Sequence, residues 1–362
     1  MKFPTVKVDV EGLKNFVSEV FVRLGVAEDD ARIIADVLVA ADQRGIMSHG
    51  VARLGRYVDG IRRGIMIPDA QPEIIRETPT ALLVDGNGGM GQVVSFKVMK
   101  KVIRRAKDMG VAYAVVRNSN HYGIAGYYAM MALEEDLIGI SATNSAPIVV
   151  PTFGRDMLFG TNPIAVAVPT GGEMPWVLDM ATSVVPRGKL EVYARQGEKI
   201  PLGWATDERG IPTDDPARVL DNIKNRRGGG ILPLGGAGEL LGGHKGFGLG
   251  ILVDIITGVL SLGSFGRYVY GKPDQPPGVC HFFAAVDPAA LVPIDQFKSA
   301  MDDLISQIKS TPLAEGAEKI WIHGEKEFLR QKVQSEKVEI EKVVIDRLRK
   351  IGEELGVPFQ LD

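Results

Sequence analysis

The feature that most restricts the possible folds is a series of strand-like runs between residues 80 and 287 that lacks regular helical connections. The runs are TALLVDG, VAYAVVRN, LIGISATN, PIAVAVPT, PWVLDMAT and CHFFAAVD. One amphipathic helix, QVVSFKVMKKVIRRAKDMG, separates the first two runs, and a second helix begins at GHKGFGLGILVDII. Parallel strands need long crossovers, whereas the strands after residue 135 follow one another through turns. The sequence therefore predicts a mixed or antiparallel sheet.

Helical periodicity dominates both ends of the chain. In residues 1–75, the segments GLKNFVSEVFVRLGV, EDDARIIADVLVAADQRG and SHGVARLGRYVDGIRRG predict three helices, and EKVVIDRLRKIGEELGVP predicts one near the C-terminus. Because an apolar stripe on a helix needs a partner, we expect the two ends to pack against each other. The predicted fold class is α/β (α+β), with a helical domain of residues 1–78 and 305–362 and a central domain of residues 79–304.

Composition and charge argue against several classes of function. A net charge of −3 and a pI near 6.0 disfavour a nucleic-acid partner, although three short helices resemble a helix-turn-helix. The start, MKFPTVKVDVEGLK, lacks the apolar core of a secretion signal. The segment GFGLGILVDIITGVLSLG contains Asp254 and five glycines, which favours a core helix over a membrane span. The single cysteine, Cys280, excludes an internal disulfide and is typical of a cytoplasmic protein.

Residues 86–91, GNGGMG, match the G-x-G-x-x-G pattern of dinucleotide-binding turns. They follow a strand, open a helix and precede a second strand, which is the context that a Rossmann site requires. Two observations oppose that interpretation. The second strand ends in Arg117 and Asn118 and not in an acidic residue, and no further βαβ units follow. A glycine-rich turn between strand and helix is favoured, with a nucleotide site as the alternative.

The segment MSHGVARLGRYVDG contains Ser48, His49, Arg53 and Tyr57. The last three are four residues apart, so on a helix they would lie along one face. A guanidinium binds a carboxylate through two parallel hydrogen bonds, and an imidazole exchanges a proton near neutral pH. The cluster predicts a site for a carboxylate-bearing substrate and a proton-transfer step. A solvated helix surface is the alternative.

A second histidine, His121, stands among small and polar residues in NSNHYGIAGYYA, at the exit of a predicted strand. Loops at strand ends often hold catalytic groups in α/β proteins, although a buried structural histidine is also consistent with the pattern. His281 and His323 have no partners at metal-ligand spacing, and the motifs HxH, HExxH and CxxC do not occur. We therefore predict that no metal takes part.

Two further stretches are candidates for ligand binding. In WVLDMATS, Asp179 ends an apolar strand, where its carboxylate either accepts hydrogen bonds from ribose hydroxyls or caps the following turn. Residues 242–248, GGHKGFG, open a helix whose free N–H groups and Lys245 offer a place for phosphate. A glycine-rich helix start packed closely against a neighbour would give the same pattern.

Five segments together resemble a known family. DQRGIMSHGVARL, NSNHYGIAGYYA, TNPIAVAVP, LDMATS and GHKGFGLGILVDI, in this order and spacing, are similar to the type-2 malate/L-lactate dehydrogenases over nearly the whole chain. That family also includes sulfolactate and ureidoglycolate dehydrogenases and diketogulonate and piperideine-2-carboxylate reductases. The resemblance implies NAD- or NADP-dependent interconversion of a 2-keto acid and its 2-hydroxy acid, with oxaloacetate and malate as the favoured pair.

The resemblance also carries structural expectations. It implies a central cofactor domain around a mixed, largely antiparallel sheet that is not a Rossmann fold, a homodimer, and an active site in the cleft between domains. GNGGMG then becomes a loop between domains. The family's polar cluster falls on Ser48, His49, Arg53 and Tyr57, and its second histidine on His121. The implied cofactor contacts are Ser145, Asp179, Met180, Ala181, Lys245 and the turn of His323, Gly324 and Glu325, where many relatives have proline in place of His323.

On this basis His121 is expected to donate the proton, with His49 orienting the substrate or sharing that role. A protonated imidazole would quench the charge that builds on the carbonyl oxygen, and Arg53 would hold the carboxylate. The polar surroundings of His121 would keep it solvated enough to change charge. Arg187 and Lys189 follow Asp179 closely and could receive the 2′-phosphate of NADP, so the choice of cofactor stays open.

Three alternatives remain at this point. The enzyme could reduce another 2-keto acid, such as sulfopyruvate, diketogulonate or pyruvate. It could be a methyltransferase that uses the GNGGMG loop for a nucleotide-like methyl donor, or a protein that binds a ligand without catalysis.

Overall fold

A computed structural model describes residues 4–172, 174–271 and 275–360. Its strands are β1 (Thr5–Asp9), β2 (Glu73–Glu77), β3 (Ala81–Asp85), β4 (Val111–Ser119), β5 (Ile138–Thr143), β6 (Ile164–Val168), β7 (Trp176–Met180), β8 (Ala205–Thr206), β9 (Gly230–Ile231), β10 (Val279–Val286) and β11 (Lys337–Glu341). Its α-helices are α1 (Val10–Arg23), α2 (Glu28–Gln43), α3 (Leu54–Arg62), α4 (Gly91–Met109), α5 (Ala125–Met131), α6 (Arg187–Gln196), α7 (Pro216–Asn225), α8 (Gly243–Asp254), α9 (Ile294–Ser310), α10 (Glu325–Val333) and α11 (Lys342–Leu355).

The centre of the molecule is a seven-stranded sheet in the order β2-β3-β4-β10-β5-β6-β7. In the described chain β3 and β4 are parallel, and every other neighbouring pair is antiparallel. The parallel pair flanks α4, so the sheet contains a βαβ unit without the repetition that a Rossmann fold requires. The predicted fold class, a mixed and largely antiparallel sheet that is not a Rossmann fold, is confirmed.

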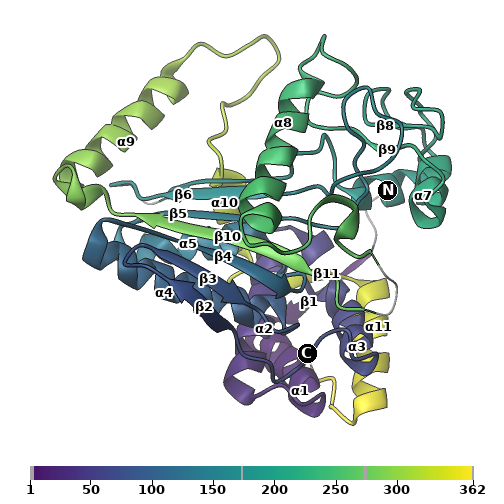
Figure 1. Ribbon diagram of the computed structural model, residues 1–362, viewed down its shortest axis with the longest axis horizontal. Coiled ribbons are helices and arrows are strands. Elements are labelled where there is room, and N and C mark those ends of the chain that lie inside the picture. The colour runs from purple at the N-terminus through teal and green to yellow at the C-terminus, as the bar shows by residue number, and fades with distance from the viewer. Residues whose placement is uncertain (1–3, 173, 272–274, 361–362) are drawn as a thin grey trace.

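Helices cover both faces of the sheet. In Figure 1, α4 and α5 lie along one face and α8 lies over the other. Val94, Val98 and Val102 of α4 recur every four residues, so they share one face and are buried in the core of the sheet. Gly110 adopts a positive φ of 80° and ends α4, so that β4 begins at the next residue.

The two ends of the chain meet in a shared core. Leu13, Phe21 and Ile34 of the N-terminal helices are buried together with Ile345 and Leu348 of α11. The ends also pair as strands, because β1 and β11 form a two-stranded antiparallel sheet. The prediction that residues 1–75 are helical is therefore wrong at β1 and again at β2. The alternation in TVKVD and KVEIE is the signal that indicates these strands. The domain boundaries proposed from the sequence stay a prediction.

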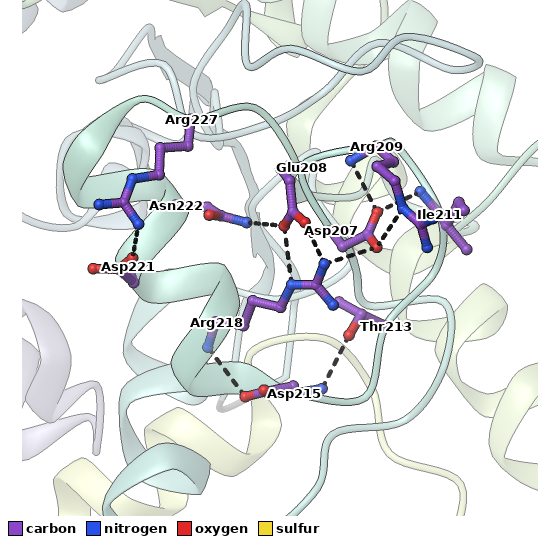
Figure 2. Close-up of polar contacts among 10 residues, drawn as sticks. All are labelled: Asp207, Glu208, Arg209, Ile211, Thr213, Asp215, Arg218, Asp221, Asn222 and Arg227. Atoms are coloured by element: carbon purple, nitrogen blue, oxygen red, sulfur yellow. Dashed lines mark hydrogen bonds and ion pairs between the residues drawn. The ribbon is translucent and has the colours of Figure 1, made fainter.

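Residues 198–216, EKIPLGWATDERGIPTDDP, are rich in proline, glycine and aspartate, and side chains fix most of this segment. The carboxylate of Asp207 accepts hydrogen bonds from the N–H groups of Arg209 and Ile211, both at 3.0 Å. Figure 2 shows Glu208 facing Arg218, whose guanidinium lowers the pKa of that carboxyl to about 2. Asp215 caps α7 by accepting a hydrogen bond from the N–H of Arg218. The loop also contributes β8, which pairs with β9.

Candidate active site

Three residues of the predicted polar cluster and the second histidine line one cavity of about 320 Å³, while Tyr57, the fourth, is buried behind His121. Ser48, His49 and Arg53 come from the segment between α2 and α3, and His121 comes from the loop between β4 and α5. Two segments that are about 70 residues apart in sequence thus meet at the same cavity. Other lining residues are Arg56, Tyr122, Thr143, Ser145, Arg187, Glu191 and Tyr270.

The segment that carries the first histidine is not the continuous α-helix that its spacing predicts. Residues 47–49 and 51–53 form two 3-10 turns, and α3 begins only at Leu54. The break depends on Asp42, whose buried carboxylate accepts a hydrogen bond from the N–H of Val51 at 2.7 Å. Gly50 makes room for it, because a Cβ there would lie 2.1 Å from Oδ1 of Asp42. His49 therefore approaches the cavity separately from the face of α3 that holds Tyr57.

The two histidines form a stacked pair. The ring centroids of His49 and His121 lie 5.5 Å apart, with 18° between the ring planes. Nδ1 of His121 lies 2.7 Å from the hydroxyl of Tyr57 and accepts a hydrogen bond from the N–H of Gly123 at 3.3 Å. A backbone N–H can only donate, so Nδ1 is the acceptor and the neutral ring carries its proton on Nε2. Nδ1 of His49 is 2.9 Å from Oγ of Ser48.

Both imidazoles are held in the neutral form near pH 7. Burial, followed by the charge of Arg56, lowers the pKa of His121 well below its usual value. Burial and the charges of Arg53 and Arg56 lower the pKa of His49 to about 4. Burial also raises the pKa of Tyr57, so its hydroxyl keeps its proton. These surroundings differ from the expectation of a solvated, protonated His121, because burial and neighbouring guanidiniums disfavour a further positive charge.

Guanidinium groups dominate the charge of the cavity. Nε of Arg53 donates to the carbonyl oxygen of Ser48 at 2.6 Å, and Arg56 donates to the hydroxyl of Tyr270. Arg187 forms an ion pair with Glu191 at 2.9 Å, and both residues line this cavity with the candidate substrate-binding residues. Asp179 does not line it. Lys189, the other residue considered for a 2′-phosphate, lies with its ammonium 5.1 Å from the centre of the Trp204 ring.

Sequence reasoning missed Arg56 and Tyr270. Arg56 follows Arg53 at a spacing of three residues, which places the two on neighbouring positions of a helical surface and is a signal that the sequence contains. Tyr270 has no such signal, because it reaches the cavity from a segment more than 200 residues away.

The candidate cofactor residues fall into three places. Ser145 follows β5 and lines the histidine cavity, where its Oγ accepts a hydrogen bond from the N–H of Thr161 at 3.1 Å. Asp179, Met180 and Ala181 lie at the end of β7. Thr182 continues from them and donates its N–H to the carbonyl oxygen of Thr161 at 2.9 Å, so the end of β7 runs into the wall of the cavity. Lys245 is exposed in the first turn of α8 and does not line the cavity.

The carboxyl group of Asp179 is fixed in place, and burial raises its pKa to about 6. It accepts a hydrogen bond from the N–H of Gly126 at 2.8 Å, and a Cβ on Gly126 would lie 2.7 Å from the same oxygen. The turn of His323 and Gly324 runs beside this strand, because the N–H of Val177 donates to the carbonyl oxygen of His323 at 3.1 Å. The Glu325 carboxylate is buried and accepts from Lys319 at 2.6 Å and from the N–H of Ile322 at 3.2 Å. That side chain stabilises the turn, and the cofactor contact predicted for Glu325 stays a prediction.

The GNGGMG segment forms the turn between β3 and α4, and the N–H groups of its first four residues are already used. The N–H groups of Gly86 and Gly88 donate to the carbonyl oxygens of Arg117 and Asn118 at 2.8 and 2.7 Å, and that of Gly89 donates to Gly86 at 2.8 Å. The Asn120 amide donates to the carbonyl oxygens of Gly88 and Gly89. A phosphate seat needs free N–H groups. With four of its six N–H groups engaged, this turn supports the loop that carries His121, which argues against the methyltransferase interpretation.

The remaining buried histidine, His281, is structural. Its two ring nitrogens lie 2.8 Å from the hydroxyls of Thr143 and Ser119, and its ring stacks on Tyr122 with centroids 4.6 Å apart. Among the described residues there is no group of three or more histidine, cysteine or acidic side chains placed to hold a metal ion. In the same part of the chain, no helix is long and apolar enough to cross a membrane.

Comparisons with known proteins agree with this architecture. Residues 8–349 match the family model described as malate/L-lactate dehydrogenase. Malate dehydrogenase of Pyrococcus abyssi is 50% identical over 353 residues, which is 97% of this chain and 96% of that protein. Malate/(S)-sulfolactate dehydrogenase of Methanothermus fervidus is 39% identical over 95% of this chain and 96% of its own. The crystal structure of malate dehydrogenase from Entamoeba histolytica superposes with a TM-score of 0.94 at 35% identity, covering 98% of this chain and 99% of that one.

Proposed function

This chain belongs to the malate/L-lactate dehydrogenase family, and we propose that it transfers a hydride between NAD or NADP and a small 2-keto or 2-hydroxy acid, with oxaloacetate and malate as the preferred pair. The observation that carries the proposal is the meeting of His49, His121 and Arg53 at one cavity. An imidazole beside a guanidinium suits proton transfer to a substrate anchored by its carboxylate.

The residues along β7 fit a dinucleotide. A carboxyl group fixed at a strand end is suited to ribose hydroxyls, which supports a role for Asp179. From there Met180 and Ala181 lead through Thr182 to Ser145 at the histidine cavity, so one continuous wall joins the two places. When bound along this wall, the nicotinamide ring supplies or accepts the hydride. The adjoining turn of His323 and Gly324 would contact the cofactor through its backbone, and the contact predicted for Lys245 stays a prediction.

The chain's own residues would hold the substrate and move the proton. Arg53 binds the carboxylate and sets the angle of the keto carbon. The substrate's carboxylate then offsets the Arg53 charge. Because that charge lowers the pKa of both histidines, anion binding favours uptake of a proton by His121. The Tyr57 hydroxyl then accepts from Nδ1–H, and Nε2–H of His121 donates to the carbonyl oxygen as negative charge builds there.

The test is turnover by histidine variants. His121→Ala and His49→Ala should each lower kcat for oxaloacetate by about 10²- to 10⁴-fold, the range expected for a lost acid–base group. Cofactor binding, followed by nicotinamide fluorescence, should be nearly unchanged because neither imidazole lies along β7. His244→Ala is the matched control, since His244 is exposed on α8 and does not line the cavity. Wild-type rates in either active-site variant would remove that residue from the mechanism.

One set of assays determines which substrate and which cofactor the enzyme prefers. Oxaloacetate, pyruvate, sulfopyruvate and 2,3-diketogulonate should be assayed with NADH and with NADPH. A relative that carries both malate and sulfolactate in its name supports sulfopyruvate as the second candidate. Cofactor binding without turnover of any 2-keto acid would contradict the proposal and favour a binding protein without catalysis.

We also infer a homodimer in the cytoplasm. The helix α8 and the segment after it present Leu252, Ile255, Val259 and Leu262 to solvent, here called the α8 face. Apolar residues that recur along one helical side are expected to be covered, and a second copy of the chain covers such a face symmetrically. The cytoplasmic location is supported by the single, buried Cys280, which suits a reducing compartment.

A further inference from the structure

We propose that Arg56, held in place by Tyr270, binds a second anionic group of the substrate, so that the cavity selects 2-keto acids with an additional carboxylate or sulfonate. The inference rests on the proposed function and assigns a residue to substrate selection within the same site. Arg53 keeps the carboxylate next to the keto group, and Arg56 takes the distal anion.

The first argument is the charge balance of the cavity. Its lining includes three guanidiniums, those of Arg53, Arg56 and Arg187, and one carboxylate, that of Glu191. Arg187 is neutralised by its ion pair with Glu191. With both histidines neutral, two positive charges remain uncompensated. A substrate with one carboxylate would offset only one of them, whereas a dianion offsets both.

The second argument is the cost of leaving these two groups without anions. Arg53 and Arg56 are both partly buried, and within the described parts of the chain neither has a carboxylate at ion-pair distance. A charge withdrawn from water without a partner is destabilising, and like charges three residues apart on a helical surface repel each other. A folded protein retains such an arrangement where a ligand supplies the missing charges.

The third argument is the way in which Arg56 is positioned. Its guanidinium donates to the hydroxyl of Tyr270 and lies 5.5 Å from the centre of that ring. Tyr270 has a positive φ of 55°, which an aromatic residue adopts at a cost. Its backbone is anchored on both sides, because its N–H donates to Pro277 at 2.9 Å and its carbonyl oxygen accepts from Arg226 at 3.0 Å. Tyr270 is therefore a positioning residue that aims Arg56 into the cavity.

The assignment has a consequence for the proton step. The Arg56 charge is the largest contribution after burial to the lowered pKa of His121. A second anion on Arg56 offsets that charge and favours protonation of His121 beyond what an anion on Arg53 does alone. Dicarboxylates should therefore gain in kcat as well as in KM when compared with monocarboxylates.

The experiment compares oxaloacetate and sulfopyruvate with pyruvate in the wild type, Arg56→Gln and Arg56→Lys. Arg56→Gln should lower kcat/KM for both dianions by about 10- to 100-fold, the loss expected for a charged hydrogen bond, and change that for pyruvate by less than about threefold. Arg56→Lys should restore part of the loss, because it keeps the charge without the planar fork. Tyr270→Phe should show a smaller loss confined to the dianions. Oxaloacetate and sulfopyruvate in parallel show which anion fits better.

Controls separate this inference from the proposed function. Arg62→Gln removes an exposed arginine of the same helix that pairs with Glu354, and it should leave all three substrates unaffected. Thermal shifts with malate and with lactate test binding even where turnover is weak, and malate should lose its advantage in Arg56→Gln. Equal losses for oxaloacetate and pyruvate in Arg56→Gln, or a selective loss in Arg187→Gln instead, would overturn the assignment. Absence of wild-type activity on every 2-keto acid would overturn the proposed function itself.

Discussion

At the scale of single residues, Asp42 decides the local geometry of the site. It is not at the cavity's centre, yet its carboxylate fixes the turn from which Ser48 and His49 extend. Burial raises its pKa to about 8, far above the usual value for an aspartate. The side chain is therefore protonated at neutral pH, and its role is that of a hydrogen-bond acceptor and not of a charge.

This gives a prediction for the pH dependence of stability. Folded Asp42 binds a proton up to about pH 8, whereas the unfolded chain releases it near the usual aspartate pKa of 3.8. The free energy of unfolding therefore falls as pH rises between these values. Asp42→Asn keeps an acceptor for the N–H of Val51 and cannot ionise. Its Tm should exceed that of the wild type by a few degrees at pH 8 and above, and by much less at pH 5, as measured by calorimetry. Asp29→Asn, at the exposed start of α2, is the control. A uniform fall in Tm across the pH range would contradict this account.

At the scale of elements, the predicted strands were found because their apolar runs are long enough to be buried on both faces. TALLVDG, LIGISATN and CHFFAAVD correspond to β3, β5 and β10. The helix drawn through His49, Arg53 and Tyr57 was wrong because a tertiary contact, from Asp42 to Val51, interrupts it. Short elements such as β1 and α6 were missed, since five to ten residues carry too little periodicity to be read without their partners.

The turn at the start of α4 is the element whose role changed most between sequence and structure. Gly91 lies against the carbonyl groups of the His121 loop, and a Cβ there would be 2.2 Å from the carbonyl oxygen of Asn120 and 2.5 Å from that of His121. Gly91→Ala should therefore displace the His121 loop and destabilise the fold by about 1–3 kcal/mol, the usual cost of overpacking. Thermal denaturation and kcat should both fall. The control is Gly248→Ala on α8, where a Cβ would meet nothing within 4 Å. An unchanged Tm in Gly91→Ala would show that the His121 loop can move without a loss of stability.

At the scale of the whole molecule, the α8 face is an apolar surface that is left exposed when only one chain is considered. Leu262 is 83% exposed, and Leu252 and Ile255 are exposed as well, on a helix that lies over one face of the sheet (Figure 1). Leu252→Glu should shift the protein from dimer to monomer in light scattering after gel filtration, because it places two charges in a symmetric interface. Val333→Glu, at an exposed apolar position at the end of α10, should not. A monomeric wild type would contradict the inference.

The cavity itself was only partly predictable. Its histidines and Arg53 were found because imidazole and guanidinium are unusual in a core stripe. Arg187, Glu191 and Tyr270 were not placed there, since they arrive from α6 and from the segment before β10, and their meeting with α3 depends on how the whole chain folds. Long-range contacts of this kind leave no local pattern in the sequence.

The position of β10 has a consequence for how the protein folds during its synthesis on the ribosome. This central strand, residues 279–286, inserts between β4 and β5, which are synthesised well over a hundred residues earlier. Until it emerges, both neighbours present open edges that attract other chains. The sheet of the nascent polypeptide therefore stays divided into two parts until β10 is synthesised. His281 of β10 then bridges Ser119 of β4 and Thr143 of β5.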